Sequence, residues 1–95
     1  MPYYLLTYEL APNYLEDRGQ YRAEHLGLAK DYRDQGLLVL GGALANPADK
    51  AVLVFQCEGR EQVEAFAKSD PYVNNGLVIS WTVQEWTVVI GSAFS

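Results

Sequence analysis

The first hydrophobic pattern in the chain has a period of two residues. Over residues 3–10, one set of alternate positions is entirely aromatic or aliphatic, whereas the other set ends in polar residues. This alternation predicts a β-strand, and both of its faces are partly apolar. One face carries Tyr4, Leu6, Tyr8 and Leu10, and the other carries Tyr3, Leu5, Thr7 and Glu9. Residues 11–13, Ala-Pro-Asn, end the strand.

The next pattern has the period of a helix. Its apolar stripe is formed by Tyr21, His25, Leu28, Ala29 and Tyr32. Two start signals compete, because Asn13 with Glu16 and Asp17 with Gln20 both have an approximate capping-box spacing, and Gly19 favours the later start. We expect the helix to run to about Gln35, since Gly36 can adopt the left-handed conformation that follows a last turn.

A β-hairpin is predicted over residues 37–58. Its first strand, Leu37–Ala45, contains Gly41 and Gly42 in its interior, where glycine marks a bulge or a close approach of ligand or backbone. Residues 46–50, Asn-Pro-Ala-Asp-Lys, are turn formers, and residues 51–58 continue as the second strand.

The rest of the chain predicts a second helix and a last strand. Gly59 can cap a helix over residues 60–69, whose buried positions are Val63, Phe66 and Ala67. This helix ends at Asp70, because the ring of Pro71 disfavours a helical conformation in the preceding residue. After a turn at residues 74–76, residues 77–90 read as a strand. Its apolar positions change face near residues 84–85, where we expect a β-bulge or a bend.

The order β-α-β-β-α-β is that of the ferredoxin-like split-βαβ fold, an α+β architecture, and residues 1–95 are expected to form one domain. Two helices can cover only one face of a four-stranded sheet. The remaining apolar positions therefore need a second cover, and a symmetric partner sheet is the simplest one. We expect a homodimer, or a higher oligomer.

Composition and charge narrow the class of protein. Of 95 residues, 49% are hydrophobic and 20% charged, which supports a packed core. The net charge of −5 and the lack of a Lys/Arg cluster argue against nucleic-acid binding. One cysteine makes no disulfide within the chain, and no segment resembles a signal peptide or a membrane span. We therefore expect a cytoplasmic protein that does not bind a membrane.

His25 is the only side chain in the sequence whose ordinary pKa, about 6.5, suits proton transfer near neutral pH. From its place on the apolar stripe alone, a core histidine held by one hydrogen bond is as reasonable as a functional one. Asp70 lies at a helix end, where the helix dipole is unfavourable for a carboxylate. It can cap a short turn that begins at Pro71, or pair with His25 and select its tautomer. One carboxylate oxygen can do each.

Other candidates have easy structural alternatives. Arg22, three residues before His25, can bind an anionic substrate group, but a surface ion pair with Glu16 or Glu24 is slightly favoured. The further candidates for a substrate pocket are Tyr8, Ser69, Tyr72 and Gly42. Trp81 and Trp86 suit a core or an interface, and Cys57 a buried, inert position. No phosphate loop, dinucleotide fingerprint or metal-ligand set is present, so we expect neither a cofactor nor a metal.

Several segments resemble the YciI-like (YCII-related) proteins. They are the R-x-x-H-L element at residues 22–26, residues 36–42 (GLLVLGG), residues 69–73 (SDPYV), residues 76–77 and residues 83–86 (VQEW). The resemblance implies a dimeric α+β barrel with a His and an Asp facing a pocket, and it maps His25 onto the catalytic histidine of the family. Its members include enzymes that act on small cyclic compounds. The polar, acidic segment of residues 12–20 departs from the commoner pattern and is expected to border the pocket.

Two functions follow as hypotheses. The first is a small cofactor-independent enzyme of lyase, isomerase or dehalogenase type, in which His25 and Asp70 form a dyad for acid–base chemistry on a small cyclic or enolisable substrate. The second is a non-catalytic dimeric domain that binds a metabolite or a protein, since fold alone does not decide between them. A pocket that is open to solvent and lined by His25 favours the enzyme.

Overall fold

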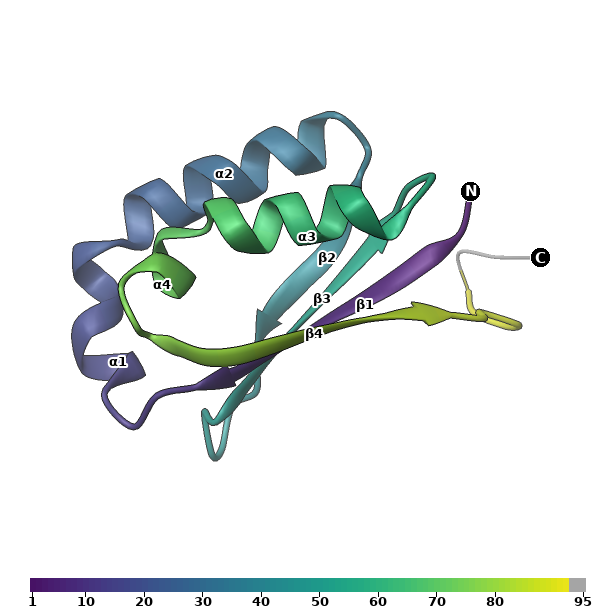
Figure 1. Ribbon diagram of the computed structural model, residues 1–95. Coiled ribbons are helices and arrows are strands. Elements are labelled where there is room, and N and C mark those ends of the chain that lie inside the picture. The colour runs from purple at the N-terminus through teal and green to yellow at the C-terminus, as the bar shows by residue number, and fades with distance from the viewer. Residues whose placement is uncertain (93–95) are drawn as a thin grey trace.

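The computed structural model describes residues 1–92 and shows an α+β fold of the ferredoxin-like type (Figure 1). Within these residues, four antiparallel strands form one sheet in the order β2-β3-β1-β4, and α2 and α3 lie over one of its faces. The elements are β1 (Tyr3–Leu10), α1 (Tyr14–Asp17), the 3₁₀ turn η1 (Arg18–Gln20), α2 (Arg22–Asp34), β2 (Leu38–Ala43), β3 (Lys50–Gln56), α3 (Arg60–Ser69), α4 (Pro71–Asn74) and β4 (Val78–Trp86).

The core lies between the sheet and its helices. Of the two faces of β1, the one that carries Leu6 is buried along its whole length, and Leu6 lies opposite the buried Leu53 of β3. Tyr32 of α2 and Phe66 of α3 make edge-to-face contacts with each other and with Phe55 of β3. These aromatic contacts hold both helices against the same part of the sheet. None of the helices described is long and apolar enough to cross a membrane.

The first helical segment differs from the expectation of one continuous helix. Both predicted start regions are helical, but α1 and η1 are separated from α2 by Tyr21. Neither capping box forms, because the side-chain amide of Asn13 donates to the carboxylate of Asp17. At the other end, α2 stops at Asp34 and Gly36 has a positive φ of 78°, as the sequence predicts. The broken segment wraps around one end of the sheet (Figure 1).

The strand irregularities lie at other residues than the sequence indicates. Of the two alternatives for the glycine pair, a bulge or a close approach, the bulge is absent, because the register shift of the hairpin falls at Val39. In β4 the register runs evenly from Ser80 to Trp86, so the bulge expected at residues 84–85 is absent, and the irregularity lies at Ile79, opposite the end of β1. The strand also ends at Trp86 instead of continuing to Ile90.

Candidate active site

A cavity of about 220 Å³ opens between the helical segment of residues 14–29 and the sheet. Its floor comes from β1, β2 and β3, and its walls come from α1, η1, the first half of α2 and Tyr72 of α4. The break between α1 and α2 lets the chain curve around the end of the sheet, so that residues of α1, η1 and α2 all line the cavity. A cavity of this size suits a small ligand.

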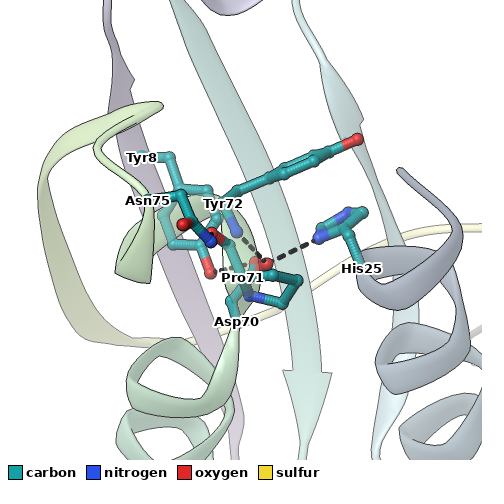
Figure 2. Close-up of polar contacts among 6 residues, drawn as sticks. All are labelled: Tyr8, His25, Asp70, Pro71, Tyr72 and Asn75. Atoms are coloured by element: carbon teal, nitrogen blue, oxygen red, sulfur yellow. Dashed lines mark hydrogen bonds and ion pairs between the residues drawn. The ribbon is translucent and has the colours of Figure 1, made fainter. Parts of the chain in front are cut away.

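His25 lies in the first turns of α2 and lines the cavity with its side chain 17% exposed. Its Nδ1 lies 2.9 Å from Oδ1 of Asp70 (Figure 2). The two residues are 45 positions apart in sequence, and the split-βαβ topology returns the chain to α2 at the start of α4. The contact between them that the sequence analysis considered is therefore present.

Asp70 is fully buried at the junction of α3 and α4, where its backbone is extended. Its Oδ1 accepts a hydrogen bond from the backbone N–H of Tyr72 at 3.0 Å, which caps α4, and its Oδ2 accepts one from the hydroxyl of Tyr8 at 2.8 Å (Figure 2). We expected one oxygen to cap and the other to meet the imidazole. Instead Oδ1 does both, because Tyr8 occupies Oδ2. Burying a carboxylate without hydrogen-bond partners is unfavourable, and these three contacts offset that cost.

Tyr8 acts as a permanent donor to this carboxylate. Burial, and then the negative charge of Asp70 beside it, raise the pKa of the Tyr8 phenol far above its usual range. The phenol therefore keeps its proton at any working pH. An ionised carboxylate only accepts hydrogen bonds, so Nδ1 of His25 is the donor in its contact with Asp70, and Nε2 is the ring nitrogen left to meet a substrate.

The ring of Tyr72 fixes the plane of the imidazole. It stacks on His25 with ring centroids 4.0 Å apart and an angle of 10° between the planes (Figure 2). The Tyr72 ring also contacts the ring of Tyr14 edge to face, with the two ring centroids 5.7 Å apart. The hydroxyl of Tyr72 is buried and has no hydrogen-bond partner within the described part of the chain. Burial raises the pKa of this phenol, which therefore remains a proton donor at neutral pH.

The position of Arg22 differs from the prediction. The ion pair with Glu16 or Glu24 that was slightly favoured is absent, and Arg22 makes no ion pair within residues 1–92. It lines the cavity instead, together with Tyr14 and Arg18, which were not singled out. The expectation that residues 12–20 border the pocket is confirmed by these two side chains. The spacing of four residues from 14 to 18 to 22 was the available signal, since it repeats one side of a helical segment.

Some of the remaining candidates line the cavity and others lie outside it. Gly42 lines the cavity, as does Gly41, whereas Ser69 is exposed at the end of α3 and takes no part in the lining. Cys57 is buried away from the cavity, its thiol donates to the backbone oxygen of Gly59 at 3.3 Å, and burial raises its pKa. Trp81 and Trp86 also lie outside the lining. Within residues 1–92, no three side chains among His, Cys, Asp and Glu come together as a metal site would require.

Comparison with known proteins now identifies the family. The model of the YCII-related domain matches residues 1–87. The chain belongs to the YCII-related family. No curated protein matches it.

Solved structures share the fold of this YCII-related chain. The 5-chloro-2-hydroxyhydroquinone dehydrochlorinase of Burkholderia phenoliruptrix, solved with 2,5-dihydroxybenzoquinone, superposes with a TM-score of 0.76 at 20% identity, over 90% of this chain and 93% of that one. A protein from Agrobacterium tumefaciens gives a TM-score of 0.62 at 16% identity, over 94% of both chains. At these identities, the likeness establishes the fold and leaves function to the site.

Proposed function

We propose that this YCII-related protein is a small enzyme in which His25 moves a proton on a small cyclic or enolisable substrate. The observation that carries the proposal is the contact between His25 and the buried carboxylate of Asp70 at the wall of a cavity. A carboxylate that holds an imidazole in one tautomer is the arrangement used in general acid–base catalysis. The dehydrochlorinase activity of the Burkholderia neighbour supports a lyase, isomerase or dehalogenase type of reaction.

In the proposed step, Nε2 of neutral His25 accepts a proton from a carbon or a hydroxyl group of the substrate, and Asp70 stabilises the imidazolium that forms. In an isomerisation, the same proton returns to another atom of the substrate. In an elimination, the electron pair of the broken C–H bond forms a double bond, and the leaving group departs with its own bonding pair. Neither route needs a redox cofactor, because only protons and substrate electron pairs move.

Substrate contacts are proposed for the candidates that line the cavity, which are Tyr8, Arg22, Gly42 and Tyr72. Ser69 is withdrawn from this set because it is exposed outside the lining. Tyr8 also has a positioning role, since its hydroxyl holds Asp70.

A second copy of the chain is proposed to cover the free face of the sheet. This open face, the side of the sheet opposite α2 and α3, carries Leu5, Leu40, Val52, Val54 and Trp86. Leu40 is 63% exposed and Trp86 47% exposed in the single chain. Packing two such faces together would give the dimeric α+β barrel that the family resemblance implies.

The test is a turnover screen on lactones and halogenated hydroxyquinones with the wild type and His25→Gln. Glutamine can keep a hydrogen bond to Asp70, so the variant should fold, but it has no basic nitrogen. We expect kcat/KM to fall by about 100-fold or more.

Lys30→Gln serves as the control, because Lys30 is exposed on the same helix and takes no part in the cavity. Equal turnover by folded His25→Gln and by this control would overturn the mechanism. The failure of every candidate substrate to react, with ligands still bound in the cavity, would favour the non-catalytic binding domain instead.

A further inference from the structure

The charge of the cavity is opposite to that of the chain. The sequence has a net charge of −5, yet the cavity is lined by Arg18 and Arg22, with no Asp or Glu side chain among its lining residues. Neither arginine makes an ion pair within the described residues. Cations that line a concave surface without carboxylate partners concentrate a positive potential there.

The contact of Arg18 with Tyr14 leaves the guanidinium available to a ligand. Its carbon lies 5.6 Å from the centroid of the Tyr14 ring, a cation–π arrangement that positions the group, and its N–H groups make no hydrogen bond within residues 1–92. Arg18 is half-buried and Arg22 is exposed. The two arginines therefore supply planar, multiple donors at the mouth of the cavity, the geometry that suits a carboxylate or another anionic oxygen.

The hydroxyl of Tyr72 is an independent sign of a missing partner. Tyr72 is only 2% exposed, and its buried hydroxyl has no hydrogen-bond partner within residues 1–92. A buried hydroxyl without a partner loses its hydrogen bonds to water and gains none in return. Burial and then Tyr14 raise the pKa of this phenol, Arg22 and Arg18 lower it, and the carboxylate of Asp70 raises it. Both arginines line the same cavity as Tyr72.

We propose that Arg18, Arg22 and the Tyr72 hydroxyl together bind an anionic oxygen of the substrate, carried as a carboxylate or an ionised hydroxyl group on a single ring. The side chain of Tyr72 stacks on the imidazole of His25. An anionic group bound at the Tyr72 hydroxyl would therefore place the ring of the substrate beside that imidazole. This inference rests on the proposed function in assigning a substrate class to the same cavity. Binding of the anion itself requires no turnover.

The test uses two pairs of unreactive probes titrated into wild-type protein by calorimetry at constant ionic strength. Benzoate against benzamide tests a carboxylate, and 4-nitrophenolate against 4-nitroaniline, at a pH that ionises the phenol, tests an ionised hydroxyl. We expect at least one anion to bind about tenfold or more tightly than its neutral partner. The pair that shows the preference identifies the anionic group.

Arg18→Gln and Arg22→Gln should each weaken binding of the preferred anion by about tenfold and leave its neutral partner nearly unchanged. Arg33→Gln is the matched control, because Arg33 lies exposed on α2, pairs with Asp34 and takes no part in the cavity. Tyr72→Phe should weaken anion binding without lowering Tm, since the hydroxyl has no partner to lose. A purely structural hydroxyl would leave the affinity unchanged.

Equal affinity for charged and neutral probes, or no binding of either anion, would overturn the inference. So would anion affinities in Arg18→Gln and Arg22→Gln that match Arg33→Gln. These results are separable from the test of the mechanism. A charge preference without turnover would support the anion site and contradict the proposed enzyme. Turnover that depends on His25, without a charge preference, would support the enzyme and contradict the anion site.

Discussion

Asp70 connects three parts of the fold through one carboxylate. It accepts hydrogen bonds from Tyr8 of β1 and from the backbone of Tyr72 in α4, and it contacts His25 of α2. All of these contacts are buried or partly buried, where a hydrogen bond to a charged group contributes more than at the surface. The same residue therefore stabilises the fold and orients the imidazole.

Asp70→Asn should lower the free energy of unfolding by about 2–3 kcal/mol, because an amide offers one acceptor oxygen where the carboxylate offers two, and its NH₂ group faces donors. We expect its turnover to fall less than that of His25→Gln, since the base itself remains. Urea denaturation measures the first effect. Asp31→Asn, an exposed change on α2, is the control and should shift stability by less than about 0.5 kcal/mol. Similar losses in both variants would contradict the role given to Asp70.

At the level of single residues, the sequence singles out His25, Asp70 and the cavity-lining candidates Tyr8, Tyr72 and Gly42, but not the contacts that join them. The helix-ending Asp-Pro pair and the stripe position of His25 are local signals. The hydrogen bond from Tyr8 and the place of Arg22 in the cavity depend on how β1, α2 and α4 meet, which no local pattern encodes. The acidic residues near Arg22 in sequence indicate a surface ion pair, whereas its place in the cavity depends on the tertiary fold.

The elements follow the hydrophobic pattern closely, and the errors concern where strands bend and where the first helical segment breaks. In β4, both Val78 and Val83 are buried, and the odd spacing between them requires one extra residue, which is Ile79. The pattern was misread near Glu85 because Trp86 faces the open side of the sheet in regular register. A large apolar residue on an uncovered face looks, in sequence, like a change of phase.

The glycine pair of β2 offers a test at the level of one strand. A Cβ added at Gly41 would lie 3.0 Å from Cγ of Leu53, whereas one at Gly42 meets nothing within 4 Å. Gly41→Ala should therefore destabilise by about 1 kcal/mol through overpacking, and Gly42→Ala should be neutral or slightly stabilising. Thermal unfolding of the two variants measures the difference. Equal stability of the two would contradict the close approach of Gly41 to Leu53.

For the whole molecule, the helices leave one face of the sheet without a cover (Figure 1). The order of strands and helices was enough to predict this topology, because few arrangements connect β-α-β-β-α-β without crossings. How two copies would meet depends on the shape of the open face in both, which a single sequence pattern does not specify.

Light scattering at micromolar concentration should give about twice the chain mass of 10.6 kDa. Leu40→Arg, on the open face, should shift the protein toward the monomer, because it places a charge among apolar side chains at the interface. Leu15→Arg is the matched control, since Leu15 is 57% exposed but lies on α1. A wild-type monomer would overturn the dimeric barrel.

The break between α1 and α2 separates two tasks along the chain. His25 contacts the fully buried Asp70, whereas Arg18 lies half-buried on a connection that begins after β1 has ended. Tyr14 on the same connection is buried and packs edge to face on Tyr72. Surface connections tolerate insertion and replacement better than core elements do. Grafting a different segment over residues 15–20, with the buried Tyr14 kept, would reshape the rim of the cavity and leave the hydrogen bonds of Asp70 in place. The residues at the rim and the contact of His25 with Asp70 can therefore change independently of each other.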